Sequence, residues 1–132
     1  YFPKKRILDM ELKKNDREPY KGILHLDCTF NPVGEDKCII YKNGFVDESD
    51  YNLILDIFGE ENCFHVTDEE MFEMNPNIFS ISPEVVVSDK AFSRMNNHLR
   101  NKWGMTVEEI PYREISKMGG LLRCSTLPLV RE

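Results

Sequence analysis

Two short stretches of the chain carry side chains that together could do chemistry. The later one, residues 119–126, reads Gly-Gly-Leu-Leu-Arg-Cys-Ser-Thr and places Cys124 beside the cation Arg123. A thiol next to a positive charge has the ingredients of an activated nucleophile. The earlier one contains His25 and Asp27, two residues apart. An imidazole and a carboxylate near a thiol would supply a general acid–base group and an anion for nucleophilic catalysis.

The alternating hydrophobicity of residues 22–30 predicts a β-strand, because successive side chains of a strand point to opposite faces. The face toward the core would hold Leu24, Leu26, Cys28 and Phe30. The opposite face would present Ile23, His25, Asp27 and Thr29. Each stretch also has an ordinary explanation: a polar pair on an exposed strand face, and a buried structural cysteine.

Taken together, the two stretches resemble the guanidino-group modifying enzymes, or pentein superfamily. That superfamily includes arginine deiminases, dimethylarginine dimethylaminohydrolases and amidinotransferases. The residues that carry the resemblance are His25-Leu26-Asp27 and the Gly-Gly-x-x-Arg-Cys-Ser-Thr segment at 119–126. A third segment, residues 77–86, is similar to the superfamily's Asn-x-x-x-(aliphatic)-x-Pro-x-x-Val pattern. The three motifs occur in the expected order and extend over most of the chain.

The resemblance implies an α/β fold that is part of an α/β propeller built from ββαβ modules. Residues 1–132 would supply about two and a half blades and form a single domain. Because enzymes of the superfamily are longer, we expect the chain to be the C-terminal catalytic half of a longer enzyme. Its partners would then be the missing N-terminal half or another copy of the chain. Strand edges left open by missing blades also predict self-association into a homo-oligomer.

The resemblance further implies a role for each residue of the motifs. Cys124 would attack the guanidino carbon of a small arginine-like substrate and form a covalent amidino intermediate, with His25 as general acid and base. Asp27 would pair with the guanidinium N–H groups. The remaining motif residues would shape the site: Asn77, Gly119, Gly120, Arg123, Ser125 and Thr126. Deimination and amidino transfer share the thiol step, so the sequence leaves hydrolase and transferase open, and the fragment alone is expected to be inactive.

Two other functions remain compatible with the sequence. One is a non-catalytic binding module that retains the propeller fold. The other is an unrelated α/β cysteine hydrolase, which would need an oxyanion hole or a nucleophile at a helix N-terminus. Against the latter, we expect Cys124 to follow its glycine turn into a strand. No cofactor and no metal are expected, because the spacing of Cys38, Cys63 and His65 fits no common zinc site.

Composition limits the remaining function classes. The formal net charge of −6 argues against nucleic acid or an anionic membrane surface as a partner. The sequence contains no apolar run long enough to span a bilayer and no signal-peptide pattern. Its four cysteines lack the CxxC spacing and predict reduced thiols in a cytoplasmic protein.

The rest of the chain alternates between predicted strands and helices, which is typical of an α/β architecture. Strands are expected at 37–41, 62–66, 78–81, 85–87 and 106–110, with a turn at 31–36 that joins the first of these to the His25 strand. One helix should begin at Ser49 or Asp50 and end at Gly59, and another should follow Ser88 or Asp89 and end at Gly104. Thr67 and Glu70 form a capping box before a short helix, and residues 112–118 predict a helical turn.

Overall fold

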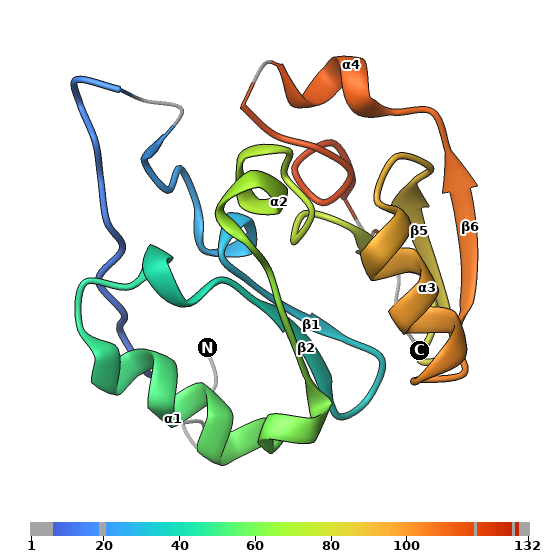
Figure 1. Ribbon diagram of the computed structural model, residues 1–132, viewed down its shortest axis with the longest axis horizontal. Coiled ribbons are helices and arrows are strands. Elements are labelled where there is room, and N and C mark those ends of the chain that lie inside the picture. The colour runs from blue at the N-terminus through green and yellow to red at the C-terminus, as the bar shows by residue number, and fades with distance from the viewer. Residues whose placement is uncertain (1–6, 19–20, 118, 128, 130–132) are drawn as a thin grey trace.

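The computed structural model describes residues 7–18, 21–117, 119–127 and 129. Within these ranges the chain forms two successive units of the same plan (Figure 1). In each, an antiparallel strand pair is followed by a helix and by a third strand that runs parallel to the second. Each unit is a ββαβ module, so the predicted α/β class and the predicted module are confirmed.

The first module contains β1 (Phe30–Val33), β2 (Lys37–Ile40), α1 (Glu48–Phe58) and β3 (Cys63–His65). The second contains β4 (Phe79–Ser80), β5 (Val85–Asp89), α3 (Ser93–Asn101) and β6 (Thr106–Ile110). The short helix α2 (Asp68–Phe72) joins the modules, and α4 (Arg113–Ser116) follows the second. Single 3-10 turns occur at Leu26–Cys28, Lys42–Gly44 and Glu60–Asn62.

Side-chain caps explain where the first two helices begin. The Thr67 hydroxyl accepts a hydrogen bond from the Glu70 amide while the Glu70 carboxylate accepts one from the Thr67 amide, so the predicted capping box is confirmed. The predicted cap of α1 at Ser49 or Asp50 is wrong, because Asp47 caps this helix by accepting from the Ser49 amide at 2.8 Å. The negative charge of the Asp47 carboxylate also interacts favourably with the positive N-terminal end of the helix dipole.

The predicted strand over residues 22–30 is wrong except at its last residue. The backbone bends at His25 and then forms a 3-10 turn, in which the His25 carbonyl accepts from the Cys28 amide at 3.1 Å and the Leu26 carbonyl from the Thr29 amide at 2.9 Å. These local bonds replace strand pairing, and β1 begins only at Phe30.

The turn also changes which side chains of this stretch are buried. Leu24 and Leu26 are 51% and 42% exposed, although the alternating pattern placed them in the core. Ile23 and Thr29 are buried instead, and the 3-10 turn between them breaks the strand's period of two. Cys28 is buried, as the pattern predicted.

The predicted hairpin after this stretch forms, but its turn is shorter than expected. Asn31 to Val33 belong to β1, which pairs antiparallel with β2, so the connection is limited to residues 34–36. The Asn31 side chain is buried and donates hydrogen bonds to the carbonyls of Pro76 and Ile78. These bonds tie β1 to the segment just before β4.

The larger of two apolar cores joins the modules. It contains Ile39 and Phe64 from the first module, Val86, Met95 and Leu99 from the second, and Ile23, Ile78, Leu121 and Leu122 from the connecting segments. The smaller core lies between α1 and the first sheet and contains Cys38, Ile40, Phe45, Tyr51, Ile54 and Cys63. None of the helices in the described ranges is long and apolar enough to cross a membrane.

Candidate active site

Three chain segments meet where the two modules join. They are the 3-10 turn before β1, the residues just before β4, and the loop that follows α4 (Figure 1). Each is held by a side chain of the larger core: Ile23 (2% exposed), Ile78 (0%) and Leu121 (0%). The polar side chains between these anchors are therefore placed by packing that involves both modules.

Cys124 lies on a turn in the last of these segments. The turn is closed by hydrogen bonds from the Ser125 amide and hydroxyl to the Leu121 carbonyl, at 3.1 and 2.6 Å, and from the Thr126 hydroxyl to the Leu122 carbonyl at 2.9 Å. Cys124 is exposed on this turn, so the expectation that it enters a strand is wrong. Ser125 and Thr126 bind the backbone and thereby fix the conformation of the turn.

The two glycines before Cys124 are required for different structural reasons. Gly119 has a φ of +87°, a conformation that residues with a Cβ rarely adopt. A Cβ on Gly120 would lie 2.8 Å from the Cys124 Cβ and 3.2 Å from its sulfur. The first glycine therefore lets the chain turn, and the second lets the Cys124 side chain fold back over the backbone.

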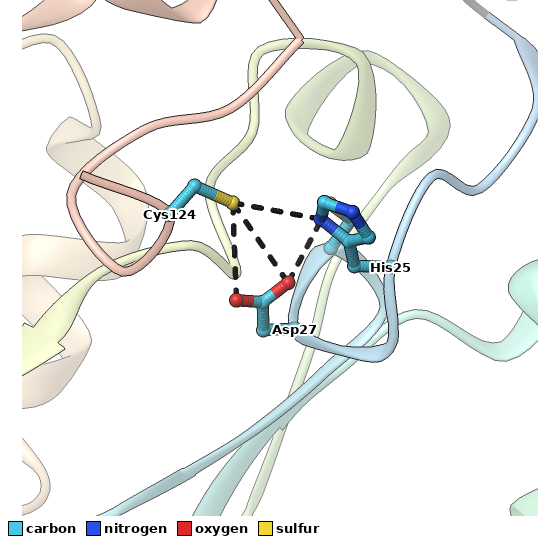
Figure 2. Close-up of side chains that lie close together, drawn as sticks. His25, Asp27 and Cys124 are labelled. Carbon is cyan, nitrogen blue, oxygen red and sulfur yellow. Dashed lines mark hydrogen bonds between the residues drawn. The ribbon is translucent and has the colours of Figure 1, made fainter. Parts of the chain in front are cut away.

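His25 and Asp27 point toward the Cys124 sulfur (Figure 2). The Cys124 Sγ lies 3.9 Å from the His25 Nδ1 and 3.8 Å from the nearer oxygen of Asp27. Both side chains come from the 3-10 turn that replaces the predicted strand: His25 precedes the turn and Asp27 is inside it. The three residues that sequence reasoning assigned to catalysis and substrate binding thus lie together, although they are 99 residues apart at the extremes.

Asn77 connects the two sides of this cluster. Its side-chain oxygen accepts hydrogen bonds from the amides of Leu121 (2.9 Å) and Cys124 (3.1 Å). Its nitrogen donates to the Asp27 carbonyl (3.3 Å) and lies 3.2 Å from the Cys124 sulfur. An asparagine side chain has two donors and two acceptor sites, so Asn77, which is fully buried, uses its whole capacity here.

The other expected site residue is placed differently. Arg123 is exposed, and its side chain makes no hydrogen bond or ion pair with the described residues. Its backbone amide donates to the Asn77 carbonyl at 3.1 Å, which adds a further bond between the Cys124 turn and the segment before β4. In this structure, then, only the backbone of Arg123 contributes to the site.

Cys28 is the residue of the cluster that sequence reasoning missed. The alternating pattern placed it in the core, and it is 1% exposed, but its sulfur also lies 3.9 Å from an Asp27 oxygen. Burial, followed by the charges of Asp27 and Cys124, raises the pKa of the Cys28 thiol to about 11. The available signal was that Cys28 directly follows Asp27, because a tight turn, unlike a strand, does not send neighbouring side chains to opposite faces.

Comparison with known proteins agrees with this geometry. The family model described as arginine deiminase matches residues 44–131. The uncharacterized protein YkgA of Bacillus subtilis (strain 168) is 31% identical over 113 residues, which cover 85% of this chain and 37% of YkgA. The chain is thus similar to only part of a longer protein.

Solved structures of the same fold also match. The crystal structure of unliganded AgrE superposes with a TM-score of 0.71 at 25% identity, over 81% of this chain and 15% of that one. The N-terminal domain of ArgZ, described as an arginine dihydrolase from the ornithine–ammonia cycle in cyanobacteria, gives a TM-score of 0.74 at 21% identity, over 86% of this chain and 40% of that one. The likeness to ArgZ supports the fold, which is a part of the pentein propeller. The chain belongs to the arginine deiminase family, within the pentein superfamily of guanidino-modifying enzymes.

Proposed function

We propose that the chain carries the thiol, the acid–base group and a guanidinium-binding carboxylate of an enzyme that acts on an arginine-like compound. The observation that supports this most directly is the convergence of His25 and Asp27 on the Cys124 sulfur, at 3.9 and 3.8 Å. Membership of the arginine deiminase family makes hydrolysis the first candidate. The same membership excludes the unrelated cysteine hydrolase that the sequence had left open.

Substrate binding would begin with the Asp27 carboxylate. A guanidinium group is a planar fork of N–H donors, and a carboxylate can accept two of them side by side. Because the Asp27 oxygens lie 3.8 and 3.9 Å from the Cys124 sulfur, a guanidinium paired with them would hold its central carbon close to that sulfur. Asp27 would thus orient the substrate as well as balance its charge.

In the first chemical half, Cys124 as a thiolate would attack the guanidino carbon and form a C–S bond, while His25 carries a proton. The resulting tetrahedral adduct collapses when one C–N bond breaks, and His25 donates a proton to the departing nitrogen. An amidino group then remains attached to Cys124. The exposed positions of His25 and Cys124 leave both within reach of the leaving group.

The second half would return the enzyme to its starting state. His25, now without its proton, accepts one from a water molecule whose oxygen attacks the amidino carbon, and the C–S bond breaks to release Cys124 as thiolate. An amine in place of water would give amidino transfer by the same steps. Throughout, the Asn77 side-chain nitrogen, 3.2 Å from the sulfur, is placed to stabilise negative charge on it.

The chain spans 37% of YkgA and 40% of the ArgZ domain. We therefore infer that the groups holding the far end of the substrate come from another segment of a longer enzyme or from a second copy of the chain. On this proposal the chain is the C-terminal catalytic half of such an enzyme and is inactive by itself. Labelling of the thiol tests the site without requiring turnover.

The test compares two alkylating reagents of the same size, 2-chloroacetamidine and 2-chloroacetamide. Only the first carries a positive planar group that Asp27 can hold. The ratio of the amidine labelling rate to the amide labelling rate should therefore be higher at Cys124 than with free glutathione. Peptide mass mapping should find Cys28, Cys38 and Cys63 unlabelled, since all three are buried. Asp27→Asn should abolish the preference for the amidine.

Two results would contradict the proposal. One is an amidine-to-amide ratio at Cys124 equal to that of glutathione. The other is a ratio that is high but unaffected by Asp27→Asn, because the carboxylate would then play no part in recognition. In either case the non-catalytic binding module becomes the better explanation.

A further inference from the structure

The cluster around Cys124 contains one more donor than the proposed reaction uses. One donor atom from each of His25, Asp27, Cys28 and Cys124 can be chosen so that all four lie within 4.8 Å of one another. Among them, the Cys28 sulfur lies 3.9 Å from an Asp27 oxygen, on the same carboxylate that contacts the Cys124 sulfur. Cys28 is therefore a buried donor behind the exposed side chains of His25 and Cys124.

We propose that these four side chains bind a soft divalent cation such as Zn²⁺ or Cd²⁺, with Cys28 as the ligand that gives the site its affinity. One nitrogen, one carboxylate oxygen and two sulfurs are a donor set that suits zinc, which favours four ligands in a tetrahedron. Harder cations such as Mg²⁺ prefer oxygen donors and would not compete.

The spacing of the donors agrees with this coordination. A point equidistant from four atoms placed 3.9 Å apart lies about 2.4 Å from each, and zinc bonds measure about 2.0 to 2.3 Å. The pairs at 3.9 Å, two of which share one Asp27 oxygen, therefore need shifts of only a few tenths of an ångström. Even the upper limit of 4.8 Å corresponds to about 2.9 Å from the centre, which side-chain rotation can reduce.

Neighbouring groups hold the donors in place. His25, Asp27 and Cys28 are fixed relative to one another by the 3-10 turn, and the Asn77 side chain ties this turn to the backbone of Cys124. Hydrogen bonds that orient metal ligands commonly change metal affinity by about 10- to 100-fold. The ion would enter from the exposed Cys124 side and reach the buried Cys28 last.

Binding of the ion and of a guanidinium would exclude each other, because both need the Asp27 carboxylate and the space beside the Cys124 sulfur. Coordination lowers the nucleophilicity of the Cys124 sulfur and fills the space that the guanidino carbon would need, so the ion would act as a reversible inhibitor. This inhibitory consequence rests on the proposed function, whereas the binding site itself does not. The two can therefore fail separately.

The experiment measures Zn²⁺ binding to the reduced chain by calorimetry, and protection of Cys124 from 2-chloroacetamide by Zn²⁺. Cys28→Ser should weaken Zn²⁺ binding by at least about tenfold and remove the protection, while alkylation of Cys124 without metal stays at the wild-type rate. Cys38→Ser is the matched control: Cys38 is another buried cysteine, but it lies in the smaller core, and its substitution should leave Zn²⁺ affinity unchanged.

Cobalt keeps the proposal testable should Cys28→Ser not fold. Co²⁺ bound to the wild-type chain should show thiolate-to-metal charge-transfer absorption of an intensity expected for two sulfurs, and Cys124→Ser should halve it. Equal Zn²⁺ affinity in wild type and Cys28→Ser, or a cobalt spectrum typical of one sulfur, would overturn the proposal. Cys28-dependent metal binding without any preference for 2-chloroacetamidine would retain the metal site and reject the guanidine-modifying function.

Discussion

Replacing Asn77 by alanine should disrupt the candidate active site while the rest of the fold remains. The side chain of Asn77 makes one fully buried hydrogen bond, to the Leu121 amide, and three partly buried contacts, to the Cys124 amide and sulfur and to the Asp27 carbonyl. Alanine provides none of them. Leu121 is fully buried, so its amide would be left without a partner and out of reach of water.

The expected cost follows from these four contacts. An unsatisfied buried amide costs about 2 kcal/mol, and each partly buried contact, for which water can substitute, contributes about 0.5 kcal/mol. The free energy of unfolding should therefore fall by about 3.5 kcal/mol. Because the lost contacts also position the Cys124 turn against Asp27, the amidine-to-amide labelling ratio at Cys124 should approach that of glutathione at denaturant concentrations where the variant is still folded.

Urea unfolding and the labelling ratio are the two assays, and Asn75→Ala is the control. Asn75 is also an asparagine buried before β4 (2% exposed), but its side-chain oxygen has no hydrogen-bond partner among the described residues. Its substitution should cost less and should leave the labelling ratio unchanged. Equal destabilisation by the two substitutions, with an unchanged ratio in both, would refute the role we assign to Asn77.

Three further predictions concern the contacts around the site. Gly120→Ala should lower stability by about 1–3 kcal/mol and slow amidine labelling, because the new Cβ would lie 2.8 Å from that of Cys124; urea unfolding and mass mapping check both. Burial, then nearby positive charges, lowers the pKa of His98 below its ordinary 6.5. The free energy of unfolding should therefore fall as the pH drops below about 6.5, since the unfolded chain binds the proton at a higher pH than the folded chain does. His98→Gln should flatten that part of the pH profile. Ile78→Ala and Ile54→Ala should each cost about 2–5 kcal/mol, but only Ile78→Ala, in the core shared by both modules, should reduce the labelling ratio.

Local sequence signals predicted most elements of the two modules. The capping box at Thr67 depends on nearby residues and is confirmed. The helix expected after Ser88 or Asp89 also forms, although α3 begins only at Ser93 and ends at Asn101. The β6 prediction, residues 106–110, is also correct at both ends. In these places, local preference and tertiary packing favour the same structure, so the sequence pattern alone is informative.

The stretch before β1 shows why local signals fail at the site. Residues 22–30 alternate as a strand does, but the Asp27 carbonyl accepts from Asn77 and the Cys28 side chain enters the larger core, and a 3-10 turn satisfies both. Asn77 lies 50 residues further along the chain, and the larger core also contains residues of the second module. The hydrophobic pattern of residues 22–30 contains no information about such distant partners. The residue types of His25 and Asp27 were therefore informative, while the predicted conformation was wrong.

The position of the site between two modules has a consequence for its chemistry. The proposed reaction needs a thiol, an imidazole and a carboxylate close together, and groups in one continuous segment could meet before the chain folds. Here Cys124 and the His25–Asp27 turn come from opposite ends of the described chain and meet only through the core that the modules share. Asn77 lies between them in sequence, and its side chain forms hydrogen bonds to both sides. The arrangement of His25, Asp27 and Cys124 is therefore expected only when both modules are folded and packed against each other.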